Sequence, residues 1–293
     1  MNEPVIVLDE LTKCYGKHRG IENISFSVTQ GEIFGFIGPN GAGKSTTIRT
    51  LMGLLKPTGG KASIFGLDCG QYAAEIAKDV GYLPSENCYY NNLNVREMLQ
   101  YTADLYGMDD RSRMEELAER LDLDLSRRIG DLSLGNKKKV GIVSALLPAP
   151  KLLIMDEPTS GLDPLVQQIF YQILREENKQ GTTIFLSSHV LSEVQKLCDR
   201  VAILREGKLI GLQSMKELRE NGYKKISITT KGPIPRDFFA ISGVANLKQD
   251  DNAASFMFNG NAMVIVDKLH QMELEDILIE EPSLEEIFLH YYE

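Results

Sequence analysis

Short continuous apolar runs, bounded by glycine or polar residues, recur along much of the chain. Runs at residues 33–37, 152–155 and 183–188 are typical of strands that are buried on both faces of a parallel sheet. Residues 24–28 instead alternate between apolar and polar side chains, as expected for a strand with one exposed face. The pattern therefore predicts an α/β fold with a buried parallel sheet and an antiparallel strand set near the N-terminal end.

A helical period replaces these runs between about residues 91 and 128. Leu99, Leu105, Leu117 and Leu121 recur at spacings expected for the apolar face of helices. We therefore predict a helical subdomain over about residues 88–145, whose last helix follows residue 133.

A change in composition near residue 220, where polar residues surround Gly222, marks a domain boundary. We predict a large domain over residues 1–219 and a small α+β domain over residues 220–293. The small domain has the order β-α-β-β-α-β, which is compatible with a ferredoxin-like split unit. Its predicted elements are strands at 226–229, 244–248, 254–258 and 274–279, a helical turn near Asp237, and helices at 261–271 and 282–289.

The most specific motif follows the run at residues 33–37 and fits the pattern G-x-x-x-x-G-K-[ST] at every fixed position. Its glycines let successive backbone N–H groups face one anion, and the start of the next helix adds partial positive charge. Lys44 is expected to reach the β- and γ-phosphates of a nucleoside triphosphate, and the Ser45 hydroxyl to ligate Mg²⁺. An ordinary glycine-rich turn is the alternative. The predicted nucleotide-binding residues are Gly38, Pro39, Asn40, Gly41, Ala42, Gly43, Lys44, Ser45 and Thr46.

An acidic pair, Asp156 and Glu157, follows the run at residues 152–155. Because parallel strands place their carboxyl ends at one edge of a sheet, we expect the pair beside the nucleotide. Asp156 is then expected to hold Mg²⁺, usually through water, and Glu157 to orient or deprotonate the attacking water. An acidic pair that caps the next helix is the alternative.

Four further segments resemble, in order and spacing, the A-loop, signature motif, D-loop and H-loop of ABC ATPases. They are Tyr15 with Gly16, residues 132–136, residues 160–163 and His189. The resemblance covers about residues 3–215. It implies a P-loop NTPase core of ABC ATPase type with an antiparallel β subdomain and a helical subdomain. It also implies a dimer that holds ATP between the phosphate loop of one subunit and the signature of the other.

The resemblance implies roles for single residues as well. Tyr15 would stack on adenine, His189 would contact the γ-phosphate, and Asp163 would belong to the D-loop. Without the family, Tyr15 is a packing residue, His189 is a hydrogen-bonded histidine at a strand end, and the serine of the signature is a helix cap. The signature residues expected to contact the ATP of the partner subunit are Ser133, Gly135 and Asn136.

The chain departs from the family's motifs in several places. Leu134 and Asn136 stand where the signature usually has glycine and glutamine. Leucine resists the positive φ angles that glycine allows, so we predict that restoring glycine and glutamine raises the ATPase rate if the chain acts as a homodimer. Ser85 occupies the place of the Q-loop glutamine and is a weak candidate metal ligand, with Glu86 as the alternative. The lysines at 137–139 are predicted to form a solvated charged face.

Composition bears on whether the chain binds nucleic acid, forms disulfides or enters a membrane. The 293 residues carry a net charge of -9, with a pI near 5.1, and this argues against nucleic acid as the main partner. The four cysteines have no paired spacing typical of zinc, so we expect reduced, structural thiols. The first residues do not resemble a signal peptide, and no apolar run approaches the ~20 residues needed to cross a bilayer.

The resemblance therefore implies an ATPase subunit of an ABC transporter, with ATP and Mg²⁺ as cofactors. It would work as a homodimer or heterodimer beneath separate transmembrane permease chains, in the cytoplasm and peripherally on the inner face of the cell membrane. Residues 282–289 resemble the end of ATPase subunits of the bacterial ABC-2-type exporter branch, which favours export. Residues 87–93 lie where the family receives the permease, and their tyrosines suit an interface, with solvent-facing loop aromatics as the alternative.

Two other functions stay open at this point. One is a soluble ABC-type ATPase that acts on the ribosome or DNA, although the acidic chain and the lack of a long coiled-coil insertion count against it. The other is a regulatory ATP-binding module with negligible turnover, against which Glu157 and His189 argue.

Overall fold

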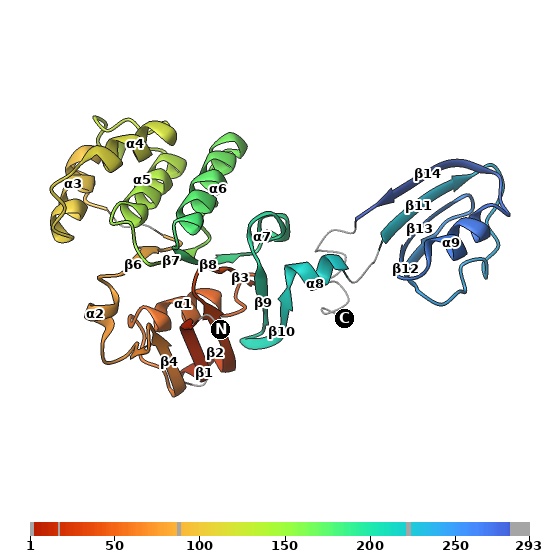
Figure 1. Ribbon diagram of the computed structural model, residues 1–293, viewed down its shortest axis with the longest axis horizontal. Coiled ribbons are helices and arrows are strands. Elements are labelled where there is room, and N and C mark those ends of the chain that lie inside the picture. The colour runs from red at the N-terminus through yellow and green to blue at the C-terminus, as the bar shows by residue number, and fades with distance from the viewer. Residues whose placement is uncertain (1–2, 17, 87–88, 221–223, 282–293) are drawn as a thin grey trace. The chain divides into compact units, whose positions relative to one another are not determined.

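The computed structural model describes residues 3–16, 18–86, 89–220 and 224–281 (Figure 1). The chain divides into two compact units, residues 1–212 and 213–293. The division falls inside strand β10 (Lys208–Ser214), a few residues before the predicted boundary. The helix predicted over residues 282–289 lies outside the described residues.

A six-stranded sheet forms the centre of the first unit, in the order β10-β9-β3-β8-β7-β6. The neighbours from β9 to β6 pair in parallel, and β3, β7 and β8 are buried along their whole length. The continuous apolar runs therefore correctly predict these three strands. Besides β10, the sheet comprises β9 (Arg200–Arg205), β3 (Ile33–Ile37), β8 (Thr183–Ser188), β7 (Leu152–Asp156) and β6 (Val80–Leu83).

An antiparallel sheet in the order β2-β1-β4-β5 packs against one side of this core. Phe26 of β2 stacks on Phe34 of β3 at a centroid distance of 5.1 Å, and Phe34 stacks on Phe185 of β8 at 5.7 Å. These rings join the two sheets into one hydrophobic core. The antiparallel strands are β1 (Pro4–Tyr15), β2 (His18–Thr29), β4 (Gly59–Ile64) and β5 (Leu67–Asp68).

Helices connect and cover the strands of the first unit. α1 contacts both β4 and β7, while α6 and α7 contact β8. The helices of this core are α1 (Lys44–Leu51), α2 (Ala73–Ile76), α6 (Pro164–Lys179) and α7 (Leu191–Leu197).

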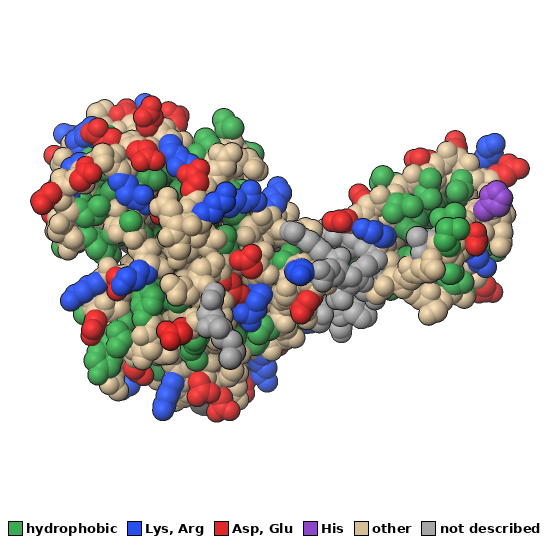
Figure 2. Space-filling view, in the orientation of Figure 1, with side chains coloured by type: hydrophobic (Ala, Val, Ile, Leu, Met, Phe, Trp, Pro, Cys, Tyr) green, Lys and Arg blue, Asp and Glu red, His purple; other side chains and the backbone are tan. Residues whose placement is uncertain are grey.

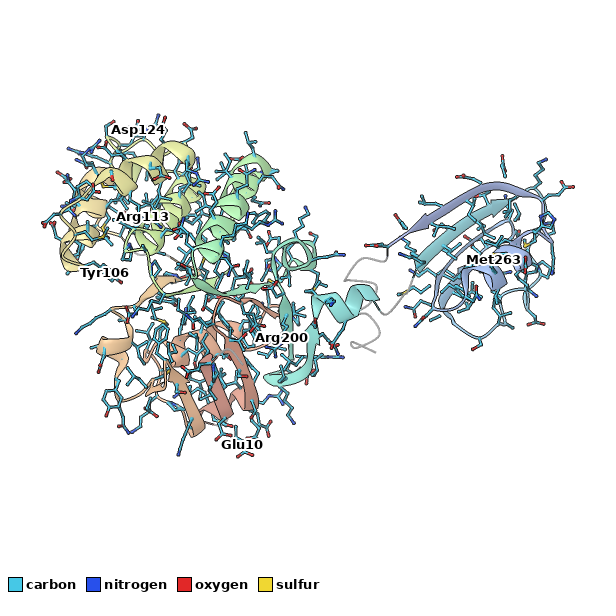
Figure 3. The ribbon with its side chains drawn as sticks, in the orientation of Figure 1. Glu10, Tyr106, Arg113, Asp124, Arg200 and Met263 are labelled. Carbon is cyan, nitrogen blue, oxygen red and sulfur yellow. The ribbon has the colours of Figure 1, made fainter. Side chains whose placement is uncertain are left out.

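The predicted helical subdomain is present as α3 (Val95–Leu105), α4 (Ser112–Arg120), the 3₁₀ turn η1 (Ile129–Asp131) and α5 (Leu134–Leu146). Leu99, Leu117 and Leu121 are buried as predicted, but Leu105 is 67% exposed. Six residues along an α-helix rotate a side chain by about 240°, so Leu105 cannot share a face with Leu99. Figure 3 shows Arg113 among these helices; its guanidinium contacts Glu177 of α6 and so links the subdomain to the core.

The second unit contains a four-stranded antiparallel sheet in the order β12-β13-β11-β14, which is the strand order of a split β-α-β unit. Ile226, Ile228, Phe239, Phe256 and Ile265 form its core. The four predicted strands and the helix predicted at residues 261–271 are present, and hydrogen-bonded turns lie near Asp237, where a short helical turn was predicted. The elements are α8 (Met215–Glu220), β11 (Lys224–Thr230), β12 (Val244–Gln249), β13 (Ala253–Phe258), α9 (Ala262–Leu269) and β14 (Leu274–Glu280).

Cys14, Cys69 and Cys198 are free thiols, and Cys88 lies outside the described residues. Burial raises the pKa of Cys69 to about 12 and that of Cys198 well above its usual value, so both remain protonated and unreactive near neutral pH. Within the described part of the chain, none of the helices combines the length and the apolar character needed to span a bilayer.

The phenylalanine cluster generates a stability prediction. Replacing Phe185 by alanine should lower the free energy of unfolding by about 3–5 kcal/mol, because it leaves a cavity where the two sheets meet. Urea unfolding of the purified chain, followed by circular dichroism, measures this loss. Tyr101→Ala on the exposed side of α3 is the control and should cost less than about 1 kcal/mol. Equal losses in the two variants would show that the cluster does not hold the sheets together.

Candidate functional site

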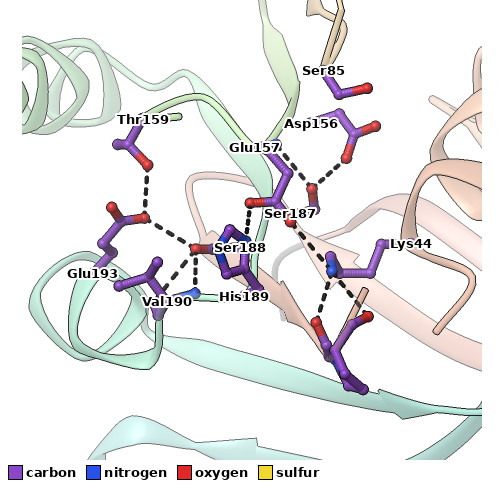
Figure 4. Close-up of polar contacts among 12 residues, drawn as sticks. Lys44, Ser85, Asp156, Glu157, Thr159, Ser187, Ser188, His189, Val190 and Glu193 are labelled. Carbon is purple, nitrogen blue, oxygen red and sulfur yellow. Dashed lines mark hydrogen bonds and ion pairs between the residues drawn. The ribbon is translucent and has the colours of Figure 1, made fainter. Parts of the chain in front are cut away.

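The phosphate loop connects β3 to α1 and depends on its glycines. Gly43 has a φ of 107°, in the left-handed region that favours glycine, and directly precedes α1. Gly38 has no space for a side chain, since a Cβ there would lie 2.4 Å from the carbonyl oxygen of Leu204 on β9. Lys44 opens the helix with its side chain buried, and its Nζ donates to the carbonyl oxygen of Gly38 at 2.7 Å and to that of Pro39 at 3.3 Å (Figure 4).

A cleft of about 400 Å³ lies beside this loop and brings together residues that are distant in the sequence. Tyr15 at the end of β1, Ser85 after β6 and Glu157 after β7 all line it. A Cβ on Gly20 would lie 2.9 Å from the Tyr15 ring, so glycine at that position leaves room for the ring. Neither Gly20 nor Arg19 stands out in the sequence, because no motif contains them. The described lining residues are Tyr15, Arg19, Gly20, Asn40, Gly41, Ala42, Gly43, Lys44, Ser45, Thr46, Ser85 and Glu157.

Asp156 ends β7 and is almost completely buried. Its Oδ1 accepts a hydrogen bond from the Ser187 hydroxyl at 2.6 Å, whereas Oδ2 has no hydrogen-bond partner among the described residues. A buried carboxylate oxygen without a partner is costly, so Oδ2 is suited to a bound cation or its water.

The described residues contain no group of three or more His, Cys, Asp or Glu side chains placed to hold a metal ion. Mg²⁺ requires no such group, because it usually keeps several waters and binds one or two carboxylates together with substrate phosphates. The Ser45 hydroxyl lines the cleft, and Asp156 directly precedes Glu157, which also lines it, so these two residues fit Mg²⁺ bound with a nucleotide.

Glu157 is contacted on both carboxylate oxygens (Figure 4). Lys44 Nζ lies 3.2 Å from Oε1, and His189 Nδ1 lies 2.7 Å from Oε2. Since an ionised carboxylate only accepts hydrogen bonds, Nδ1 carries the proton in this contact. The backbone of Glu157 has a φ of 50°, which is uncommon for a residue with a side chain, and its N–H donates to the Ser187 hydroxyl at 3.1 Å. Ser187 thus supports both acidic residues, a role that the sequence did not reveal.

The lysines at the start of α5 are not a solvated face, and that prediction was wrong for two of them. Lys138 is 4% exposed, and its Nζ donates to the carbonyl oxygens of Pro84 at 3.3 Å and Ser85 at 3.2 Å. Lys139 is also buried, and its Nζ donates to the carbonyl oxygen of Asp122. α5 is surrounded by other elements along most of its length, so its polar positions are buried with its apolar ones. Burial lowers the pKa of Lys138, while the nearby Asp156 and Glu157 charges oppose that shift.

The signature segment begins α5, with Ser133 as its N-cap. The Ser133 hydroxyl accepts a hydrogen bond from the Asn136 N–H. Leu134 is the first residue of the helix and is 75% exposed, so no positive φ is needed there, and the expected conflict with leucine is absent. Gly135 is required instead, because a Cβ on it would lie 2.6 Å from the carbonyl oxygen of Gly161.

Asp163 caps α6 through a hydrogen bond from the Val166 N–H. Asp163 and the three predicted signature residues are not among the described residues that line the cleft. Within a single chain the structure therefore brings together Tyr15, the phosphate loop, Ser85 and Glu157, but not the signature and the D-loop.

Comparison with known proteins agrees with this geometry. A family model described as ABC transporter matches residues 21–160. The bacitracin transport ATP-binding protein BcrA of Bacillus licheniformis is 41% identical over 212 residues, which cover 70% of this chain and 68% of BcrA. The linearmycin resistance ATP-binding protein LnrL of Bacillus subtilis is 33% identical over 298 residues, which cover 96% of each protein.

Solved structures confirm the predicted fold class. A structure of an ATP-binding subunit of an ABC transporter is similar with a TM-score of 0.69 at 32% identity, over 74% of this chain and 92% of that one. The predicted ABC ATPase core is therefore correct, and so is the prediction of an ATPase. The chain belongs to the ABC transporter family as an ATP-binding, ATP-hydrolysing subunit.

Proposed function

We propose that this chain binds ATP with Mg²⁺ in the cleft beside the phosphate loop and uses its hydrolysis to power export through separate permease chains. The convergence of Lys44 and His189 on the carboxylate of Glu157 is the observation that carries this proposal. It joins a phosphate-binding cation, a water-activating carboxylate and a hydrogen-bond donor at one edge of the parallel sheet.

In this proposal the adenine stacks on Tyr15, and the phosphates lie along the backbone of residues 38–46. The Tyr15 ring is 45% exposed at the rim of the cleft, which leaves a face for the base. The Ser45 hydroxyl and Asp156 would hold Mg²⁺, with Ser85 as a weaker third candidate. When bound, Mg²⁺ neutralises charge on the β- and γ-phosphates.

Glu157 then has two successive partners. In the structure its charge is compensated by Lys44 at 3.2 Å. A triphosphate carries more negative charge than one carboxylate, so it attracts the Lys44 ammonium away from Glu157. Glu157 is then available to orient or deprotonate the attacking water, and the His189 ring is placed to contact the γ-phosphate.

A second ATPase subunit would complete each site. The start of α5, with Ser133, Gly135 and Asn136, and the D-loop with Asp163 lie outside this chain's own cleft. A capped helix N-terminus is suited to an anion, so we assign these residues to the ATP of the opposing subunit. The dimer can be formed by two copies of this chain or by this chain and a related ATPase.

The loop after β6 is the proposed contact with the permease. Tyr90 is 62% exposed there, whereas the Tyr89 hydroxyl donates to the carbonyl oxygen of Lys137 on α5. The loop is thereby connected to the signature helix, which would relay closure of the dimer to the permease. In this assembly the chain lies on the cytoplasmic face of the membrane.

Export is favoured by the relatives. BcrA is named for bacitracin transport and LnrL for linearmycin resistance. We therefore propose an exporter that confers resistance to a toxic compound. Nucleic acid is not a proposed partner, because the chain has a net charge of -9 and acidic side chains are present beside the basic ones on the face shown in Figure 2.

The roles at the nucleotide can be separated by two substitutions. Lys44→Ala should weaken ATP binding by at least about tenfold, because it removes a buried cation from the phosphates. Glu157→Gln should change the ATP Kd less than about twofold yet lower hydrolysis by more than about 100-fold, since only the water-activating group is lost. Titration with a fluorescent ATP analogue and a phosphate-release assay measure the two effects. Equal loss of binding in both variants would contradict this division of roles.

The signature can be tested in trans by mixing two inactive variants. Asn136→Asp keeps the size of the side chain and favours the helix start, but it places a negative charge where the partner's γ-phosphate is proposed to bind. Alone it should be inactive, as should Lys44→Ala. Mixed dimers combine one intact phosphate loop with one intact signature, so part of the ATPase rate should return in a homodimer. No recovery in mixtures that are shown by crosslinking to contain mixed dimers would exclude this arrangement for two copies of the chain.

We also propose that residues 220–293 form an accessory domain without a catalytic role. A chain that ends at residue 219 should bind ATP with a Kd close to that of the full chain, because every residue of the cleft lies before that point. Isothermal titration of both purified chains checks this. A truncated chain that is folded by circular dichroism but does not bind ATP would contradict the proposal.

A further inference from the structure

A second carboxylate, Glu193, is buried close to the nucleotide site and has no role in the function proposed above. It lies in the first turn of α7 and is 7% exposed. Its Oε2 accepts hydrogen bonds from the Thr159 hydroxyl at 2.9 Å and from the Ser188 hydroxyl at 3.0 Å (Figure 4). One carboxylate oxygen therefore joins two segments that are 29 residues apart in the sequence, the loop after β7 and the end of β8.

Tyr171 of α6 is a third partner of this carboxylate. Burial raises the pKa of the Tyr171 phenol, and the charge of Glu193 and a hydrogen bond to it raise that pKa further. α6 begins at the D-loop residue Asp163, so the carboxylate also contacts the helix that follows the D-loop.

The two joined segments carry the groups assigned to ATP hydrolysis. Thr159 follows Glu157 by two residues and begins the stretch that leads to the D-loop. Ser188 directly precedes His189, and its hydroxyl also accepts a hydrogen bond from the Val190 N–H at 2.9 Å. The turn that presents His189 is therefore built on Ser188, and Ser188 is held by Glu193.

The stability of the buried Glu193 carboxylate depends on the geometry of its hydrogen-bond partners. Among the described residues its contacts are with three hydroxyl groups, and no lysine, arginine or histidine pairs with it. A buried carboxylate that relies on hydroxyl donors is stable only while those donors keep their geometry. Removal of the carboxylate leaves the Thr159 hydroxyl without its acceptor and leaves the Ser188 hydroxyl only the longer contact to the Val190 carbonyl oxygen at 3.4 Å, so the two segments are no longer joined.

We propose that Glu193 is a positioning residue for ATP hydrolysis, which holds the His189 turn and the D-loop segment in a fixed relation to each other. The inference rests on the proposed function of Glu157 and His189. Glu193 does not itself line the cleft, so it acts through the groups that it holds.

The test compares Glu193→Leu with Glu193→Gln in the full chain. Leucine removes the acceptor, whereas glutamine keeps its shape and one carbonyl oxygen that accepts the same hydrogen bonds. We expect Glu193→Leu to lower kcat by at least about tenfold while the ATP Kd changes less than about twofold, and Glu193→Gln to retain most of kcat. In a chain that already carries His189→Ala, Glu193→Leu should lower kcat less than about threefold further, because the imidazole is already absent and only the position of the D-loop segment can still change.

Glu177→Leu is the matched control for loss of a buried acid. Glu177 is also buried, but it pairs with Arg113 at the far end of α6 and lies outside the cleft. This variant should lower the melting temperature and leave kcat unchanged. If Glu193→Leu does not fold, Thr159→Val and Ser188→Ala remove the donors while the acid remains, and each should lower kcat without changing Kd.

Three results would overturn the proposal. The first is a folded Glu193→Leu chain with unchanged kcat. The second is a double variant in which Glu193→Leu lowers kcat by the same factor with His189→Ala as without it. The third is unchanged kcat in both Thr159→Val and Ser188→Ala. Failure of the proposed function would give a different result, since the Glu157→Gln chain would then retain its ATPase rate. An inactive Glu157→Gln chain beside an unaffected Glu193→Leu chain would refute the role of Glu193 alone.

Discussion

The carboxylate of Glu157 lies between two nitrogen atoms, Lys44 Nζ at 3.2 Å and His189 Nδ1 at 2.7 Å. These groups follow β3, β7 and β8, and β8 lies between the other two strands in the parallel sheet. Parallel pairing places the carboxyl ends of all three strands at one edge, which is where open α/β sheets bind their ligands. The buried apolar strands thus act as the rigid support on which a charged site is assembled.

The same contact relates nucleotide binding to hydrolysis in the proposed function. A lysine that is paired with the water-activating carboxylate must change partner when phosphates enter, so ATP itself prepares the site. Glu157 is held for this purpose by a left-handed backbone and by the Ser187 hydroxyl, which also contacts Asp156. Backbone strain of this kind persists only where the surrounding structure supports it, and it concentrates at functional sites.

Buried polar side chains connect the site to the rest of the first unit. Lys138 joins the signature helix to the loop after β6 through two carbonyl oxygens, and Glu193 joins the D-loop segment to the His189 turn through hydroxyl groups. Each is satisfied by neutral partners, so each favours one arrangement of the segments that it contacts. Through these contacts the helical subdomain touches the loop that carries Ser85, and the D-loop segment touches the turn that carries His189.

The sequence by itself determined the phosphate loop, the buried strands and the acidic pair, because these depend on local backbone geometry and on apolar runs that the chain carries in one stretch. It also determined the strands of the second unit, which are short runs bounded by turn residues. Only the tertiary structure decided that Lys138 is buried, that Leu105 is exposed, that Leu134 needs no positive φ and that Glu193 binds hydroxyls of two distant segments. Burial and hydrogen-bond partners are set by which elements pack together, and residues far apart in the chain carry no local pattern that reveals their contact.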